Sequence, residues 1–190
     1  DLAADDDTAD DADDITSQTV ELTISGSGET GALVQLYDGV TPIAGTSIPV
    51  VEGGFSIDID LLPGIHEITT VLSDDAGNNS EASAPLILTI DPIADPPTGL
   101  DLAEEDDTGS AGDNITSITS ALTISGSGEN GATVQLYDGG TPIAGASATV
   151  SDGSFLIDLP LAEGVHSITA VQTDLAGNES GASDPLDITV

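Results

Sequence analysis

The sequence contains no lysine and no arginine among its 190 residues, although it has 35 aspartate and glutamate residues. Two histidines are therefore the only side chains that can carry positive charge, and the formal net charge is −35. Binding to nucleic-acid phosphates needs lysine and arginine, so nucleic acid is excluded as a partner. Anionic membrane surfaces would repel the chain for the same reason. Each carboxylate must be solvated, hydrogen-bonded or bound to a cation from solution.

Cysteine, tryptophan and long apolar runs are also absent. No disulfide can stabilise the fold, and no stretch approaches the roughly 20 apolar residues of a membrane-spanning helix, so we expect no membrane insertion. The sequence shows neither an initiator methionine nor a signal peptide, as expected for a fragment of a longer chain. High net charge with few aromatic residues is typical of disorder, but the hydrophobic residues recur periodically, which favours a folded chain.

The sequence consists of two copies of one module, whose equivalent positions differ by 100 in residue number. Residues 22–29 recur unchanged at 122–129, and residues 35–39 recur at 135–139. The segment that joins the copies contains three prolines, which favour an extended and semi-rigid path. The sequence therefore predicts a first domain at residues 1–90, a short linker at 91–98 and a second domain at 99–190.

Short segments of alternating apolar and polar residues predict β-strands in each copy, at residues 22–24, 34–36, 55–59, 66–72 and 86–90 of the first. No segment keeps a helical period, so we expect almost no helix. The predicted core of the first copy, with its counterparts in the second, is Leu22, Ile24, Val34, Leu36, Phe55, Ile57, Ile68, Leu86 and Leu88. A module of about 100 residues with this pattern suits one immunoglobulin-like β-sandwich.

A set of short motifs is distributed over both copies. In the second copy they are Asp106-Asp107-Thr108-Gly109, Asp113-Asn114-Ile115-Thr116, Ser125-Gly126, Leu136-Tyr137-Asp138-Gly139 and Asp174 with Asn178. Together they resemble the bacterial immunoglobulin-like repeats of giant RTX and biofilm-associated cell-surface adhesins. The first copy departs from this pattern with Ala9 in place of Gly109.

That resemblance implies an all-β chain of two tandem immunoglobulin-like sandwiches arranged end to end in an elongated molecule. It also implies an extender, a spacer that holds adhesive domains away from the cell and carries calcium at the domain junctions. The implied location is the extracellular surface of a Gram-negative bacterium, reached by type I secretion. The expected partners are neighbouring repeats of the same chain, and the chain is expected to be monomeric.

The topology of an immunoglobulin sandwich predicts which acidic loops meet at the junction. The loop after the first strand of copy one lies at the end where the last strand finishes, whereas the loop between the last two strands of copy two lies at the opposite end of its domain. The predicted ligands at the junction are Asp6, Asp7, Asp13, Asp91, Asp95, Asp174 and Asn178. Their equivalents at the free ends are Asp74, Asn78, Asp106, Asp107 and Asp113.

Calcium is the metal that this set favours, because it takes six to eight oxygen ligands and the clusters contain neither histidine nor cysteine. The alternative interpretation is that these aspartates are solvated turn residues. His66 and His166 each begin a predicted strand and are expected to be corner residues that bond the backbone. No nucleophile motif accompanies them, so we expect no enzyme activity. The alternative function is a calcium-dependent binding module, either lectin-like or homotypic and cadherin-like.

Overall fold

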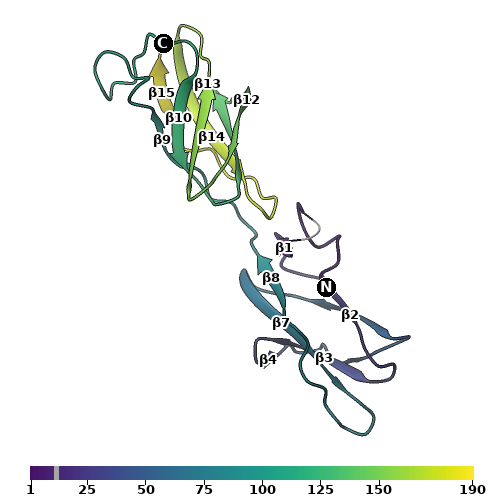
Figure 1. Ribbon diagram of the computed structural model, residues 1–190. Coiled ribbons are helices and arrows are strands. Elements are labelled where there is room, and N and C mark those ends of the chain that lie inside the picture. The colour runs from purple at the N-terminus through teal and green to yellow at the C-terminus, as the bar shows by residue number, and fades with distance from the viewer. Residues whose placement is uncertain (11–12) are drawn as a thin grey trace. The chain divides into compact units, whose positions relative to one another are not determined.

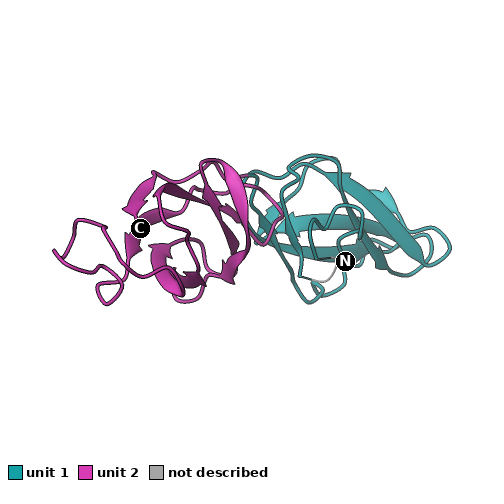
Figure 2. Ribbon diagram, turned by 90° about the horizontal axis from the view of Figure 1, so that it is seen from above, with its two compact units in different colours: residues 1–92 teal, residues 93–190 magenta. Residues whose placement is uncertain are grey.

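The computed structural model describes residues 1–10 and 13–190 (Figure 1). The chain divides into two compact units, unit 1 at Asp1–Pro92 and unit 2 at Ile93–Val190 (Figure 2). Every helix or strand element within the described residues is a β-strand, as the alternating pattern predicted. None of these residues form a helix with the length and hydropathy to cross a bilayer. Each unit is an immunoglobulin-like β-sandwich made of two sheets.

The larger sheet of unit 1 has six strands, and the smaller has two. The larger one runs, in order, β1 (Ile15–Thr16), β8 (Leu86–Ile90), β7 (Gly64–Ser73), β3 (Leu33–Asp38) and β4 (Thr41–Pro42), with β5 (Ile48–Pro49) also paired to β3. The smaller one pairs β2 (Leu22–Ser27) with β6 (Gly54–Ile59). Only β1 and β8 run parallel; the other strand pairs of this unit are antiparallel.

Unit 2 has a three-stranded sheet and a four-stranded sheet. The first orders its strands as β13 (Ser154–Leu159), β10 (Leu122–Ser127) and β9 (Thr98–Leu102). The second orders them as β12 (Thr141–Thr149), β11 (Thr133–Asp138), β14 (Val165–Thr173) and β15 (Leu186–Thr189). All these pairs are antiparallel. Strand β9 has no named strand as its counterpart among the described residues of unit 1.

Alternate residues of the facing sheets fill the space between them, which is why the period of two in the sequence located the core. All nine predicted positions of unit 2 are buried: Leu122, Ile124, Val134, Leu136, Phe155, Ile157, Ile168, Leu186 and Ile188. Seven of the nine are buried in unit 1. The other two, Phe55 and Leu86, are only partly buried although they pack against the same cluster.

The repeated Ser-Gly pair in the first long strand of each unit has a steric cause. A Cβ atom added to Gly126 would lie 2.4 Å from Cζ of Phe155, and one added to Gly26 would lie 2.4 Å from Cζ of Phe55. Such contacts are far inside the van der Waals limit, so the phenylalanine ring can cover the strand only where the backbone has no side chain. Glycine is required at this position because the phenylalanine ring lies directly against the backbone of the strand.

Replacement of Gly126 by alanine should therefore lower the free energy of unfolding by about 1–3 kcal/mol, because Phe155 must leave its place in the core. Gly181→Ala is the matched control, since its Cβ would meet nothing closer than Cγ of Pro96 at 3.6 Å. We expect that variant to stay within about 0.5 kcal/mol of the parent chain in urea unfolding. Equal losses in both variants would contradict the packing argument.

Candidate functional site

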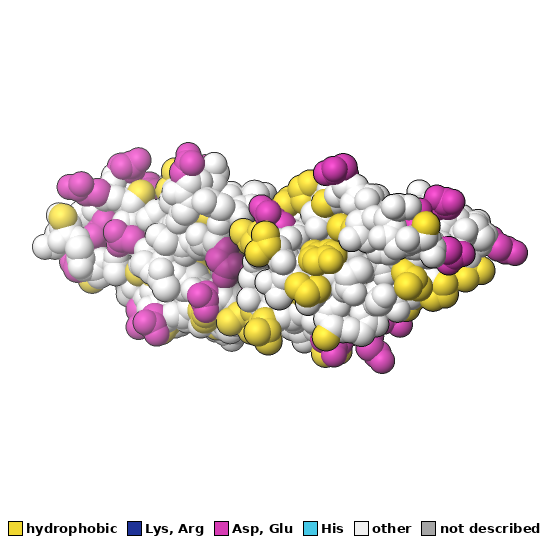
Figure 3. Space-filling view, turned by 90° about the horizontal axis from the view of Figure 1, so that it is seen from below, with side chains coloured by type: hydrophobic (Ala, Val, Ile, Leu, Met, Phe, Trp, Pro, Cys, Tyr) yellow, Lys and Arg dark blue, Asp and Glu magenta, His cyan; other side chains and the backbone are white. Residues whose placement is uncertain are grey.

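The acidic loop after residue 3 of unit 1 lies beside the end of the last strand, as the topology predicted. The backbone N–H of Thr89 donates to the carbonyl of Asp14 over 2.9 Å, and that of Asp91 donates to the carbonyl of Thr16 over 2.8 Å. These bonds place Asp14 and Asp91 at the same end of the sandwich. Acidic side chains are spread over the face of the molecule drawn in Figure 3, with hydrophobic side chains between them.

Two of the predicted ligands accept a hydrogen bond from the backbone of a core strand. Oδ2 of Asp6 accepts from the N–H of Thr23 at 2.8 Å, and Oδ2 of Asp106 accepts from the N–H of Thr123 at 2.7 Å. Each carboxylate therefore ties its loop to the start of β2 or β10. A carboxylate offers about four lone pairs, so this bond leaves acceptor positions for a cation.

Asp13 and Asp113 shape the turns that lead into the parallel pairing with the last strand of each unit. Oδ1 of Asp13 accepts from the N–H of Ile15 at 3.0 Å, and Oδ1 of Asp113 accepts from the N–H of Ile115 at 3.1 Å. Both are turns of the kind in which an aspartate bonds its own backbone two residues on. For Asp13 and Asp113, the structure therefore agrees with the alternative that these aspartates are turn residues.

Asp7 and Asp107 lie further inside the same loops. Oδ2 of Asp7 accepts from the N–H of Asp14 at 3.4 Å, and Oδ2 of Asp107 accepts from the N–H of Gly112. Oδ1 of Asp107 is buried and has no hydrogen-bond partner among the described residues. A buried carboxylate oxygen without a donor is costly, and a bound cation would remove that cost.

At the opposite end of unit 2, a buried glutamine fastens the incoming chain. Nε2 of Gln172 donates to the carbonyl of Asp95 at 2.7 Å and to Oε1 of Glu129 at 3.0 Å. Its Oε1 accepts from the N–H of Glu129 at 3.1 Å, and the N–H of Asp95 donates to Oε1 of Glu129 at 2.6 Å. Both the nitrogen and the oxygen of the Gln172 side-chain amide are thus hydrogen-bonded inside the fold, where the residue is 1% exposed.

Asp174 follows the strand that carries Gln172 and closes a turn with Asn178. Its Oδ1 accepts from the N–H of Asn178 at 2.8 Å, and its Oδ2 accepts from the side-chain amide of Asn178 at 2.7 Å. Ligand oxygens of Asp174 and Glu129 lie within 4.8 Å of one another. This acidic cluster of unit 2 could hold a metal ion.

The sequence predicted Asp95, Asp174 and Asn178 at this end but missed Glu129 and Gln172. A signal for the glutamate was present, because Glu29 and Glu129 each close the unchanged segment at residues 22–29 and 122–129. For Gln172 the signal was a difference between the copies, since the equivalent residue of unit 1 is Leu72. A polar residue in an otherwise apolar strand position is a reason to look for a partner.

In unit 1 the equivalent turn is formed by Asp74 and Asn78. The N–H and the side-chain amide of Asn78 donate to the two carboxylate oxygens of Asp74, each at 2.8 Å. The bond from the amide of Asn78 is the main reason that the pKa of Asp74 lies below its usual value. Asp74 follows the end of β7, while Asp91 lies next to the start of that strand, so the predicted ligands occupy opposite ends of the unit.

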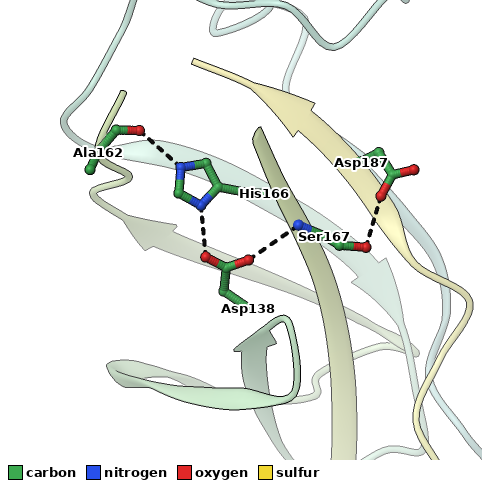
Figure 4. A network of polar contacts seen from close by, with 5 residues as sticks. All are labelled: Asp138, Ala162, His166, Ser167 and Asp187. Atoms are coloured by element: carbon green, nitrogen blue, oxygen red, sulfur yellow. Dashed lines mark hydrogen bonds and ion pairs between the residues drawn. The ribbon is translucent and has the colours of Figure 1, made fainter. Parts of the chain in front are cut away.

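Each histidine bonds a carboxylate and a backbone carbonyl, as Figure 4 shows for His166. Nδ1 of His166 lies 2.7 Å from Oδ2 of Asp138, and its Nε2 lies 2.9 Å from the carbonyl of Ala162. Both oxygens are hydrogen-bond acceptors, so the two contacts favour an imidazole that carries a proton on each ring nitrogen. The prediction of a half-buried histidine that bonds the backbone is confirmed. In a catalytic triad Nε2 would face a hydroxyl group, whereas here it is bonded to a carbonyl.

These contacts raise the pKa of both histidines above the ordinary value of 6.5. For His166 the hydrogen bond to Asp138 is the largest cause, and it outweighs the opposite effect of burial. For His66 burial is the largest single effect and lowers the pKa, but the bonds to Asp38 and to the carbonyl of Leu62 together exceed it. The only cationic side chains of the protein are therefore tied to carboxylates inside their own units.

Asp138→Asn should lower the pKa of His166 and leave that of His66 unchanged, because unit 1 keeps its own Asp38. Titration of the two imidazole rings by NMR gives both values in one sample. If both pKa values shift together, or neither shifts, the pairing of each histidine with its own carboxylate is contradicted.

The same contacts make stability depend on pH. A pKa raised in the folded state gives a stabilisation that is complete below about 6.5 and is lost as the pH rises through the folded value. We expect the free energy of unfolding of the parent chain to fall over this range and that of Asp138→Asn to fall less. Aspartate and glutamate ordinarily titrate near pH 4, outside this window.

The model of the family described as Bacterial Ig-like domain matches residues 1–92 and again 94–190. Bacillopeptidase F of Bacillus subtilis (strain 168) is 30% identical over 167 residues, which are 88% of this chain and 10% of that protein. The chain thus spans about a tenth of the length of this curated relative.

Two solved structures are also similar to this chain. One is the BSP domain of a biofilm associated protein, with 19% identity and a TM-score of 0.37 over 92% of this chain and 28% of that one. The other is a bacterial ice-binding adhesin, with 19% identity and a TM-score of 0.41 over 94% of this chain and 60% of that one. The two matches of the family model, one to each unit, show that the chain belongs to the bacterial Ig-like domain family and contains two of its domains in tandem.

Proposed function

We propose that the chain is a non-catalytic extender of a bacterial cell-surface adhesin, in which calcium binds at the junction between the units and stiffens it. The observation that carries this proposal is the acidic cluster of Glu129 and Asp174 at the end of unit 2 where the chain enters. No lysine or arginine is available to neutralise it. A cation from solution is then the available source of positive charge at this end of unit 2.

The chemistry of the cluster fits calcium better than zinc. Its ligand atoms are carboxylate oxygens, and calcium accepts six to eight oxygen ligands in flexible geometry. Each carboxylate already accepts hydrogen bonds that hold it in place, from Gln172 and from Asn178. Because these bonds fix the oxygens before an ion arrives, binding needs little further ordering of the side chains.

Asp91 is the candidate that would bring unit 1 into the site. It is four residues before Asp95, whose backbone is held by Glu129 and Gln172. Four residues span at most about 14 Å, so the chain keeps Asp91 within that distance of Asp95 for any orientation of the units. Asp13 and Asp14 lie at the same end of unit 1 as Asp91 and are further candidates. An ion shared between these residues and the cluster would restrict the joint.

This arrangement suits secretion to a calcium-rich exterior. Unbalanced carboxylates weaken the compact state while calcium is scarce, which favours transport of an unfolded chain, and calcium outside then completes the fold. We place the protein outside the cell, at the surface of a Gram-negative bacterium and exported by type I secretion. Its partners are the neighbouring repeats of the same chain, and it is monomeric.

Calcium should raise the thermal stability of the chain through the residues of unit 2. If the dissociation constant is about 0.1 mM, as in extracellular modules, then 10 mM calcium adds about 2.7 kcal/mol relative to EDTA. The double variant Glu129→Gln and Asp174→Asn should lose most of this increment. The matched variant Glu29→Gln and Asp74→Asn should keep it, because those residues lie at the other end of unit 1 from Asp91. The proposal fails if thermal melts in EDTA and calcium coincide.

Small-angle X-ray scattering tests the stiffening itself. Calcium should narrow the distribution of end-to-end distances in the parent chain, whereas the Glu129→Gln and Asp174→Asn variant should scatter alike with calcium and with EDTA. Asp91→Asn should reduce the change in scattering more than it reduces the thermal shift, because it removes the ligand from unit 1. A parent profile that calcium leaves unaltered would rule out a calcium-stiffened joint.

A further inference from the structure

An open cavity of about 390 Å³ lies on one side of unit 2, between the edges of its two sheets. Strand β9 is an edge strand of the three-stranded sheet, and β15 is an edge strand of the four-stranded sheet. The two strands lie close to one another (Figure 1), but the sheet order does not pair them. The cavity is formed by residues 96–100, which lead into and begin β9, and by residues 182–185, which precede β15.

The walls of this cavity are largely apolar and stiff. They include Pro96, Pro97, Leu100, Ala182 and Pro185. Proline rings fix the backbone φ angle, and Leu100 packs against the core of the unit, so the walls are set before a ligand arrives. A cleft of roughly 300–1,000 Å³ with mainly apolar walls and a few polar groups is the usual form of a ligand site.

Asp184 is the one charged residue of the cavity lining. The neighbouring hydroxyl of Ser183 accepts from the N–H of Ala170 at 2.9 Å and donates to the carbonyl of Asp184 at 2.9 Å. The carboxylate of Asp184 is exposed, and it has no hydrogen bond or ion pair within residues 1–10 and 13–190. Unit 1 has Ala84 at the equivalent position, so the carboxylate is a feature of unit 2 alone.

A positive charge that pairs with Asp184 has to come from another molecule. The chain contains no lysine or arginine, and both histidines are bonded to carboxylates of their own units. The net charge of −35 attracts cations and repels anions around the protein. A bare metal ion would bind a carboxylate without using the apolar walls. The walls and the charge together therefore fit an aliphatic group that ends in a cation.

We propose that this cavity binds a lysine or arginine side chain of another protein, whose aliphatic stem packs on the proline rings and on Leu100 while its charged end lies at Asp184. Both side chains bury their stems on apolar surface and keep the charged end near water, as an open cavity allows. A second copy of this chain is excluded as the partner, because it has no such side chain. The site is independent of the calcium proposal, since none of its lining residues is a candidate calcium ligand.

The test measures binding of N-acetyl-lysine methylamide to the full chain by NMR, in calcium buffer. The control ligand is N-acetyl-norleucine methylamide, which has the same aliphatic side chain without the ammonium group. The lysine compound should shift the amide signals of Leu100, Ala182 and Ser183 saturably, and the norleucine compound should bind about fivefold more weakly, because it cannot pair with a carboxylate. Asp184→Asn should weaken binding of the lysine compound by a similar factor. Glu163→Gln, which also removes one exposed carboxylate of unit 2, should leave it unchanged.

Equal binding of the two compounds to the parent chain, or the absence of saturable shifts at the three amides, would overturn the proposal without any variant. Equal weakening by the two substitutions would also overturn it, because net charge and not Asp184 would then hold the ligand. Both variants keep every candidate calcium ligand, so failure of this experiment is distinct from failure of the calcium proposal.

Discussion

The lack of lysine and arginine decides how this protein compensates its negative charge. With no lysine or arginine, the carboxylates cannot form the usual ion pairs, and many are held instead by N–H donors of the fold. Asp6 bonds the backbone of Thr23, and Asp174 bonds both the backbone and the side-chain amide of Asn178. These neutral donors orient a carboxylate but do not remove its charge. These carboxylates are therefore held in place and remain attractive to divalent cations, which is the physical basis of the proposed calcium dependence.

Because the chain contains two copies of one module, each position of unit 1 has an equivalent in unit 2 with surroundings of its own. Phe55 and Phe155 occupy equivalent positions, and Phe155 belongs to the buried core of unit 2, against which Leu100 packs. At another position the two copies differ in sequence, because Gln172 stands where unit 1 has Leu72. The side-chain amide of Gln172 binds both the carboxylate of Glu129 and the backbone carbonyl of Asp95. Unit 2 is thus specialised at the end where the chain enters.

The residues that pack each module and the residues that could bind an ion lie in different parts of each unit. The sandwich core and the histidine–aspartate pairs stabilise each module. The predicted ligands lie in loops at the ends of the units, outside the hydrophobic core. The hydrogen bonds of His166 to Asp138 and to the carbonyl of Ala162 connect the end of β11 to the start of β14.

Local patterns in the sequence predicted five strands of each unit and most of the core, because alternation acts over a few positions, but they did not predict β1, β4, β5, β9 or β12. The immunoglobulin topology predicted the end of unit 1 at which its acidic loop lies. Only the tertiary structure decided which side chains meet. Gln172 reaches Asp95 across 77 positions and Glu129 across 43, and His166 reaches Asp138 across 28. Such contacts are products of packing between distant strands, which no local period encodes.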